Sequence, residues 1–323
     1  MTKQQTFQQE FQDHVKEGLS AFPKFLSSKY IYDDRGDELF QQIMDLPEYY
    51  LTNAEYNIID TYKKEISQRF ETVGGFDLIE LGAGDGKKTK LLLEQFHKDQ
   101  VDFTYIPIDI SQHSIDELTK SLKQTYPQMD VQGEQGLYFS VLKDLAKYNE
   151  RPKLILVLGS NIGNLKHPEA IDFLNQLRNL MSGKDALFMG FDQKKDPLTI
   201  QNAYADKTGV TQAFNRNLLH RLNREMDANF EVDIFDHWES YDPETGTAKS
   251  YLIATEPCEV SIKKLDFTTS FKKWETIHTE ISQKYDDDVV NWLAQEAGLK
   301  IDSIYEDQNR MFKNYLFLTV DNK

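Results

Sequence analysis

The sequence predicts an α/β fold with a mostly parallel, doubly wound sheet, joined to a second α+β domain. Strand and helix patterns alternate between residues 76 and 192, which is typical of parallel strands linked by crossover helices. The alternation stops after Asp192, where helical and short strand patterns come in runs, and it returns from Asp286 onward. We expect a sheet domain of residues 55–194 and 285–323, and a second domain of residues 1–54 and 195–284.

Composition and charge limit the possible partners. Of the 323 residues, 39% are hydrophobic and 28% are charged, which is ordinary for a globular protein. The formal net charge of −16 disfavours nucleic acid and anionic membranes, because like charges repel. Met1–Gln12 has no apolar signal core, no stretch is apolar enough to span a bilayer, and the single cysteine, Cys258, excludes a disulfide framework. We expect a cytoplasmic monomer that acts on a small molecule.

The first part of the chain combines helical patterns with many tyrosines. Apolar residues at helical spacing between Thr6 and Phe22 predict one helix, and Asp37 can cap a second. Tyrosines are dense in the following stretch, at Tyr30, Tyr32, Tyr49, Tyr50 and Tyr56. Such rings often pack in a core, but they also suit a positively charged ligand through cation–π contacts.

The stretch from Phe76 to Leu93 predicts a buried strand, a glycine turn and a helix. Glycine has no Cβ, so the backbone of such a turn can approach a ligand closely. The start of the next helix adds free N–H groups and a positive dipole end.

Several cofactor patterns can be compared with this turn. Gly82 and Gly84 fit a dinucleotide fingerprint, but Lys87 stands where its third glycine is required. A P-loop is excluded, because its first glycine would fall on Leu81. The remaining pattern is an acid followed by alternating glycines, from Glu80 to Gly86. It resembles the first motif of S-adenosylmethionine-dependent methyltransferases, and we favour a cofactor over a turn without a ligand.

Further strands predict a shared ligand edge. Phe103–Asp109 is expected to be a strand that ends in an acid, and Asp109 would accept hydrogen bonds from ribose hydroxyls; the alternative is a helix N-cap. Lys153–Leu158 and Ala186–Asp192 are the next buried strands. Because the carboxyl ends of parallel strands form the ligand edge, one group of residues is expected there. These are Gly82, Asp109, Asn164 and Asp192.

The second half of the chain departs from this pattern and then resumes it. Thr199–Phe230 is expected to be helical. Strands are expected at Phe235–Trp238, Ser250–Thr255, Val260–Phe267 and Trp274–Ser282. Val289–Ala297 predicts a helix ended by Gly298, and a closing hairpin follows at Ile301–Glu306 and Tyr315–Val320.

Several kinds of chemistry lack their motifs. The sequence has no His-Glu-x-x-His, no paired cysteines and no carboxylate cluster at metal-loop spacing, so we expect no metal site. It also has no Gly-x-Ser-x-Gly elbow, which disfavours a serine hydrolase. Methyl transfer from a sulfonium needs an aligned nucleophile rather than covalent help, so residues that position an amine are its expected signature.

Motifs along nearly the whole chain, from about Leu19 to Val320, resemble the histidine-specific S-adenosylmethionine-dependent methyltransferase family. The motifs are Lys29–Gly36, Asp37–Phe40, Leu46–Thr52, Glu80–Gly84, Lys88–Thr89, Gly159–Asn164, Ala213–Asn217 and Thr279–Ser282. The family includes the histidine Nα-methyltransferases of ergothioneine biosynthesis. The resemblance implies a Rossmann-like class I methyltransferase fold and a transferase that uses S-adenosyl-L-methionine.

The resemblance also implies roles for residues of this chain. S-adenosylmethionine would be held by Gly82, Gly84 and Lys88, with Asp109 on the ribose and Tyr138 near the adenine. The amino-acid site would be shaped by Tyr32, Phe40, Tyr49, Gly159, Asn164, Tyr204, Phe214, Ser250, Glu280 and Ser282. Of these, Asn164 would accept a hydrogen bond from the reacting amine, and Tyr32 would lie near that amine and help to remove its proton. Tyr49 and Tyr204 would hold the carboxylate, and Glu280 with Ser282 would hydrogen-bond the imidazole.

Two positions depart from the family pattern. Family members usually place a bulky apolar residue, often methionine, against the imidazole, whereas this chain has Ser250, which is expected to widen or wet the pocket. The adenine segment reads Gly136-Leu137-Tyr138, and Leu137 has no acceptor side chain; Glu134 is an alternative acceptor. We expect methylation of the α-amino nitrogen of L-histidine to the trimethylated betaine. The alternatives are another amino acid, such as tryptophan or tyrosine, or an inactive methyltransferase-like binding protein.

Overall fold

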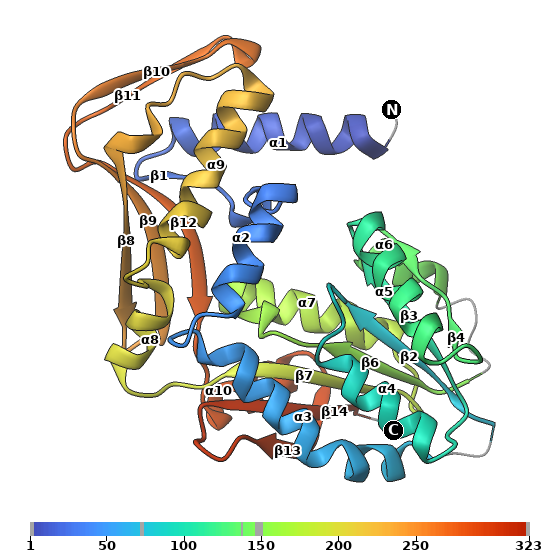
Figure 1. Cartoon of the computed structure of the whole chain (residues 1–323). Coiled ribbons are helices and arrows are strands. Elements are labelled where there is room, and N and C mark those ends of the chain that lie inside the picture. Colours follow the sequence, from blue (N-terminus) through green and yellow to red (C-terminus); the bar gives the residue numbers. More distant parts are fainter. Residues whose placement is uncertain (1–2, 72–73, 137, 146–150, 321–323) are drawn as a thin grey trace. The chain divides into compact units, whose positions relative to one another are not determined.

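The computed structural model describes residues 3–71, 74–136, 138–145 and 151–320. The chain forms two compact units, each built from two separated segments (Figure 1). Unit 1 comprises Met1–Tyr50 and Lys195–Ser282, and unit 2 comprises Leu51–Lys194 and Gln283–Lys323.

Unit 2 is organised around one eight-stranded sheet with the order β13-β14-β7-β6-β2-β3-β4, and β5 pairs with β3. Its strands are β2 (Phe76–Leu81), β3 (Phe103–Asp109), β4 (Asp130–Val131), β5 (Glu134–Gln135), β6 (Lys153–Val157), β7 (Ala186–Asp192), β13 (Leu299–Glu306) and β14 (Phe312–Thr319). β2, β3, β4, β5, β6 and β7 pair in parallel, and β14 is antiparallel to both β7 and β13. The predicted parallel sheet with a closing hairpin is confirmed.

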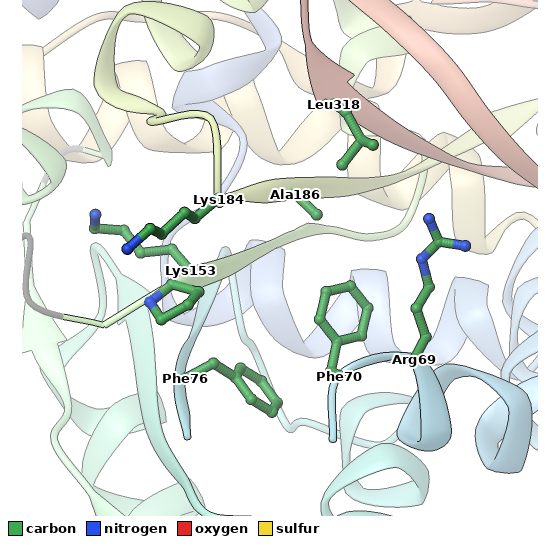
Figure 2. Close-up of a pocket in the computed structure, with 8 residues that line it drawn as sticks. Arg69, Phe70, Phe76, Lys153, Lys184, Ala186 and Leu318 are labelled. Carbon is green, nitrogen blue, oxygen red and sulfur yellow. The ribbon is translucent and has the colours of Figure 1, made fainter. Parts of the chain in front are cut away.

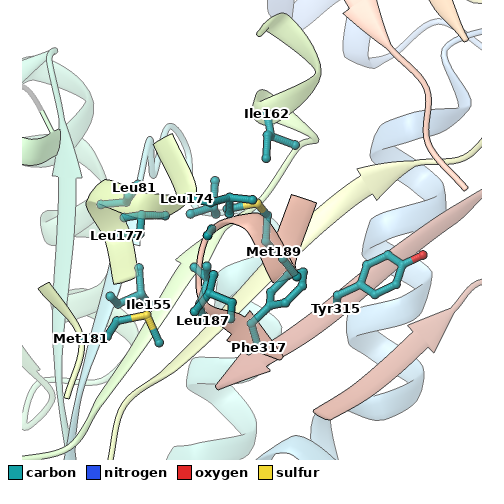
Figure 3. Packing of buried hydrophobic residues seen from close by; sticks show 14 of the residues in the cluster. Leu81, Ile155, Ile162, Leu174, Leu177, Met181, Leu187, Met189, Tyr315 and Phe317 are labelled. Atoms are coloured by element: carbon teal, nitrogen blue, oxygen red, sulfur yellow. The ribbon is translucent and has the colours of Figure 1, made fainter. Parts of the chain in front are cut away.

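Helices cover both faces of this sheet, because its buried strands are apolar on both sides. The helices of unit 2 are α3 (Tyr50–Arg69), α4 (Thr89–Lys98), α5 (Gln112–Thr125), α6 (Tyr138–Leu145), α7 (His167–Leu180) and α10 (Asp287–Glu296), with a 3₁₀ turn η2 (Asn161–Asn164). Leu174 and Leu177 of α7 pack with Ile155 and Leu187 of the central strands (Figure 3). On the other face, the ring of Phe76 packs against Phe96 of α4 at 5.4 Å between centroids.

Unit 1 has a smaller sheet of the order β1-β12-β9-β8 and a separate two-stranded ribbon, β10-β11. The strands are β1 (Lys24–Phe25), β8 (Phe235–Asp242), β9 (Thr247–Ala254), β10 (Cys258–Ile262), β11 (Phe267–Phe271) and β12 (Thr276–Gln283). The helices are α1 (Lys3–Ser20), α2 (Asp34–Met44), α8 (Pro197–Tyr204) and α9 (Val210–Met226), with short 3₁₀ turns η1 (Ser28–Tyr30), η3 (Val232–Ile234) and η4 (Lys263–Leu265). The predicted α+β character of this part is therefore confirmed.

Two local predictions for unit 1 were wrong. The helical pattern from Thr199 to Phe230 is divided into α8 and α9 by a short connection that ends at Gly209, whose φ is 82°. The cap of α2 is Asp33 rather than Asp37, because the Asp33 carboxylate accepts the backbone N–H of Gly36 at 2.8 Å.

Unit 2 also contains a cavity of about 310 Å³ at the amino ends of its strands (Figure 2). It is lined by Arg69, Phe70, Phe76, Pro152, Lys153, Lys184, Ala186 and Leu318. Phe76, Lys153 and Ala186 begin β2, β6 and β7. The predicted ligand residues follow the carboxyl ends of these parallel strands, so this cavity holds none of them. Among the described residues, no helix is long and apolar enough to cross a membrane.

Candidate functional site

The glycine turn after β2 has the backbone that the sequence predicted. Gly82, Gly84 and Gly86 have φ angles of 75°, 52° and 65°, a region that side chains with a Cβ rarely enter. A Cβ on Gly82 would lie 2.7 Å from the hydroxyl of Tyr138. The turn is thus closely covered by Tyr138 of α6, one of the predicted cofactor residues.

Glu80, the acid that opens this motif, lies behind the turn and is 3% exposed. Its carboxylate accepts hydrogen bonds from the hydroxyls of Thr89, at 2.5 Å, and Tyr105. Burial raises the pKa of Glu80 to about 7, although these hydroxyls and Lys88 favour the charged form. Glu80 therefore supports the turn from the interior of the sheet, and its charge can change near neutral pH.

Lys88 follows the turn and is held by a residue that the sequence analysis did not identify. Its ammonium donates to Glu55 of α3 at 2.5 Å, and the same carboxylate oxygen accepts the backbone N–H of Gly159 at 2.7 Å. Glu55 has no exposed surface, whereas the Lys88 side chain is 20% exposed. The helical spacing of Glu55 from Leu51 and Ile58 puts an acid on an apolar helix face, but nothing in the sequence indicates Lys88 as its partner.

Asp109 ends β3, as predicted. Its carboxylate accepts the backbone N–H of Gly84 at 3.2 Å and that of Ser111 at 3.0 Å. The alternative N-cap role is wrong, because Ser111 caps α5 by accepting the N–H of Ser114. Burial first, and then the charge of Asp109, raises the pKa of Tyr138 to about 12, so Tyr138 is a neutral phenol beside this acid.

The adenine segment of the motif is described only in part. Leu137 lies outside the described residues. Glu134, the alternative acceptor, is exposed in β5 and pairs with Ile108 of β3.

The residue that ends β7 has a structural role, whereas the residues that follow β6 stay candidates for the site. Gly159, with φ 85°, and exposed Asn164 follow β6. Asn164 does not cap the helix that follows it, because α7 has Lys166 as its N-cap. Asp192 at the end of β7 is fully buried and pairs with Lys284 at 2.8 Å, and its backbone N–H donates to Ser160. Asp192 is thus a structural acid, whereas Gly159 and Asn164 stay candidates for the site.

In unit 1, the predicted aromatic residues lie together. Tyr32 packs against Phe40 and Phe214 at ring-centroid distances of 5.6 and 5.4 Å. Tyr49 lies 6.3 Å from Phe40 and 6.0 Å from Tyr204. These residues come from the α2 region, α8 and α9, so the fold of unit 1 gathers rings that the sequence keeps far apart.

Polar groups of β12 adjoin this cluster. The hydroxyls of Tyr204 and Ser282 are 2.8 Å apart. The pKa of Tyr32 is raised well above its ordinary value, mainly by burial and next by the charge of Glu280. Glu280 is therefore within electrostatic range of Tyr32, and Tyr32 is protonated at neutral pH. The structure thus places Tyr32, Glu280 and the Tyr204–Ser282 pair in one region of unit 1.

Ser250 has surroundings that the sequence did not predict. It is 3% exposed, and its hydroxyl donates to the carboxylate of Glu239 at 2.6 Å across the β8–β9 pair. Its backbone carbonyl accepts the hydroxyl of Thr279, the neighbour of Glu280, at 3.1 Å. The hydroxyl of Ser250 thus faces a second buried acid, Glu239, and the effect of the small side chain on the pocket stays a prediction.

The donor sets favour an organic cofactor over a metal ion. Within the described part of the chain, no group of three or more His, Cys, Asp and Glu side chains could hold a metal. In unit 2, open glycine backbone, the Lys88 ammonium and the Asp109 carboxylate follow neighbouring strands. They match the carboxylate and the ribose hydroxyls of S-adenosylmethionine, so the residues present fit that cofactor.

Comparison with known proteins decides the family. The model of the histidine-specific, S-adenosylmethionine-dependent methyltransferases matches residues 11–319. The chain belongs to this family. It is 35% identical over 287 residues to the histidine N-alpha-methyltransferase of Mycolicibacterium smegmatis, with 88% of each chain covered.

Two further relatives extend the comparison. The histidine N-alpha-methyltransferase of Mycobacterium tuberculosis is 33% identical, over 88% of this chain and 87% of its own. The Ergothioneine biosynthesis protein 1 of Schizosaccharomyces pombe is 29% identical over 90% of this chain, which spans 38% of that protein. As a member of the histidine-specific methyltransferase family, the chain is a transferase with S-adenosylmethionine as its cofactor and an amino acid as its substrate.

For a histidine-specific methyltransferase, the division of residues between the units is informative. Gly82, Gly84, Lys88, Asp109, Tyr138, Gly159 and Asn164 belong to unit 2, and Tyr32, Phe40, Tyr49, Tyr204, Phe214, Ser250, Glu280 and Ser282 belong to unit 1. The residues predicted for the cofactor thus share the parallel-sheet unit. Those predicted for the amino acid are mostly in the other unit.

Proposed function

We propose that this chain methylates the α-amino nitrogen of L-histidine with S-adenosylmethionine, in three rounds, to the trimethylated betaine. The observation that carries the proposal is the group of residues in unit 1 that joins an aromatic cluster to Glu280 and the Tyr204–Ser282 pair. In this proposal unit 1 recognises the amino acid and unit 2 binds the cofactor.

Glu280 and Ser282 would recognise the imidazole of histidine. A carboxylate can only accept hydrogen bonds, and a hydroxyl can donate or accept. Neutral imidazole has one N–H donor and one acceptor nitrogen, so the pair can satisfy both ring atoms. The Ser282 hydroxyl already lies 2.8 Å from the Tyr204 hydroxyl. The two hydroxyls would therefore divide their hydrogen bonds between each other and the bound amino acid.

Tyr49 and Tyr204 would hold the substrate carboxylate, and Asn164 would accept a hydrogen bond from the amine. The ring centroids of the two tyrosines are 6.0 Å apart, which is compatible with two phenol donors on one carboxylate. Tyr32 enters the proposal as a neutral hydrogen-bonding group, because its raised pKa keeps the phenol protonated.

The reaction is a displacement at carbon. S-adenosylmethionine supplies a methyl group bound to a positively charged sulfur. The amine lone pair forms the new N–C bond while the C–S bond breaks, and the electron pair of that bond goes to sulfur. The amine must be deprotonated before every round, the first included, and each proton would leave to solvent. The rings of Tyr32, Phe40 and Phe214 would tolerate the growing quaternary ammonium through cation–π attraction.

The test is an assay of the purified protein with S-adenosylmethionine and each common amino acid, read by mass spectrometry. We expect histidine to gain three methyl groups. Gain on tryptophan or tyrosine instead would move the activity to that substrate, and no gain on any amino acid would refute the proposal. Glu280→Ala should weaken histidine binding by about tenfold to a hundredfold, because a bound polar group loses its partner. Glu256→Ala, an exposed acid of unit 1, serves as the control.

We also propose that the enzyme acts as a cytoplasmic monomer on the free amino acid. The net charge of −16 supports a small free substrate, because it disfavours nucleic acid and anionic membranes as partners. Sedimentation velocity of the active protein tests the oligomeric state. A stable dimer at assay concentration would contradict the proposal.

A further inference from the structure

Glu55 of α3 is a fully buried acid in unit 2 with hydrogen-bond donors from three different elements. Lys88 and the backbone N–H of Gly159 donate to one carboxylate oxygen, at 2.5 and 2.7 Å. The side-chain amide of Asn314 on β14 donates to the other oxygen at 2.8 Å. The acid therefore links the glycine-turn segment, the end of β6 and the closing hairpin.

The sheet is built to admit this carboxylate. A Cβ on Gly190 of β7 would lie 2.1 Å from the Glu55 oxygen that accepts the Asn314 amide, so any other residue there would displace the acid. A Cβ on Gly159 would lie 3.6 Å from the Lys88 nitrogen. The absence of a side chain at Gly190 thus leaves room for the carboxylate, whereas the distance at Gly159 is that of an ordinary contact with Lys88.

The ion pair is asymmetric in its access to solvent. Glu55 has no exposed surface, but the Lys88 side chain is 20% exposed. An ammonium has three N–H donors, and the bond to Glu55 uses one of them. Buried ion pairs seldom add stability over apolar residues, so their retention is better explained by the geometry that they impose. Here the geometry keeps a partly exposed cation beside Gly159 and the glycine turn.

We propose that Glu55 is a positioning residue for the cofactor. It holds the Lys88 ammonium so that a free N–H can receive the carboxylate of the cofactor's methionine part, which is its only anionic group. It also fixes the amide of Gly159, which follows the neighbouring strand. This inference rests on the proposed cofactor site of unit 2, and it adds a residue that touches no ligand itself.

Glu55→Gln removes the charge and keeps the shape. The Asn314 side-chain oxygen has no hydrogen-bond partner among the described residues. Rotation of the Asn314 amide would present this oxygen to the new Gln amide, so the variant is expected to fold. Its melting temperature without ligand checks this. Glu55→Asp is a second variant that can carry the test. It keeps the charge, but its side chain is one methylene shorter and holds the carboxylate farther from Lys88.

Calorimetry with two ligands separates positioning from a purely structural effect. S-adenosylhomocysteine has the carboxylate, and 5′-methylthioadenosine lacks it. We expect Glu55→Gln to weaken S-adenosylhomocysteine binding about tenfold to a hundredfold, the loss of one charge-assisted hydrogen bond, and to change 5′-methylthioadenosine binding less than about twofold. A purely structural role would weaken both ligands alike and would overturn the inference. Unchanged or tighter binding of S-adenosylhomocysteine would also overturn it.

A double-mutant cycle tests whether Glu55 acts through Lys88. In a Lys88→Met background, Glu55→Gln should cause no further loss of S-adenosylhomocysteine binding, because the cation to be positioned is gone. Additive losses would show that Glu55 acts by another route. If the wild-type protein binds neither ligand, the proposed cofactor site fails, and the inference fails with it.

Discussion

Replacement of Glu80 by Gln should make the protein more stable at alkaline pH than the natural sequence. Glu80 is 3% exposed behind the glycine turn, where it accepts hydrogen bonds from Thr89 and Tyr105. Burial raises its pKa from 4.5 to about 7. The folded protein therefore holds a proton on Glu80 at pH values where the unfolded chain has released it.

The sign and size follow from proton linkage. A raised pKa adds stability that is fully present below the unfolded value of 4.5 and is lost as pH rises through about 7. The shift corresponds to about 3 kcal/mol of unfolding free energy, at 1.36 kcal/mol for each pKa unit. Gln resembles the protonated acid and does not titrate. The variant should thus match the natural protein near pH 4.5 and exceed it by about 3 kcal/mol well above pH 7.

Urea unfolding of both proteins over this pH range measures the difference. Other titrating groups contribute equally to the two proteins, so the difference between them isolates Glu80. Glu71→Gln, an exposed acid of the same unit, should show no such pH-dependent gain. The reasoning would be refuted if the unfolding free energies of Glu80→Gln and the natural protein changed with pH in parallel, or if the variant were the less stable protein at alkaline pH.

Three further substitutions test other parts of the site. Ser250→Met removes the hydroxyl that donates to buried Glu239, and it should lower the unfolding free energy, measured in urea, by about 1–3 kcal/mol. The double variant Ser250→Met/Glu239→Leu should recover part of this loss. A single variant as stable as the natural protein would contradict the importance of the buried pair. Tyr32→Phe should lower the rate of methylation but leave the pH midpoint of kcat/KM unchanged, because the phenol of the natural protein stays protonated over that range. A shifted midpoint would show that Tyr32 is the group that titrates. Gly82→Ala should weaken cofactor binding, since its Cβ would lie 2.7 Å from the Tyr138 hydroxyl. Gly209→Ala has a similar φ of 82°, but its Cβ would make only an ordinary contact, 3.8 Å from the Gln212 side chain, and it should retain binding if the contact rather than backbone strain matters.

The parallel-sheet architecture could be predicted because its signals are local. β6 and β7 contain continuous apolar runs, β2 is apolar apart from Asp77 and Glu80, and the glycines that follow β2 have the positive φ that their spacing indicated. Cap residues were less predictable. Asp33 and Asp37 are both acids near the start of α2, and only the backbone geometry selects Asp33.

The hydrogen-bond and ion-pair partners of the site residues could not be predicted from the sequence. Lys88 was expected to face the cofactor, but nothing in its spacing indicated Glu55, which lies on a helix before the sheet begins. Ser250 suggested an open pocket, whereas its pairing with Glu239 depends on the register of two antiparallel strands. Such contacts are set by tertiary packing, and one sequence gives no information on which buried acids meet which donors.

The division of each unit into two distant segments has a consequence for how the chain is made. β1 pairs with β12, at Lys24 opposite Ile277, and β14 enters the sheet beside β7 only after the whole segment 195–282 has been synthesised. Neither sheet can be completed while most of the chain is still being translated. Such long sequence separations slow folding, because loop-closure entropy must be overcome before the contacts form. Until β14 has been synthesised, the backbone N–H and C=O groups on that edge of β7 therefore lack their partner strand.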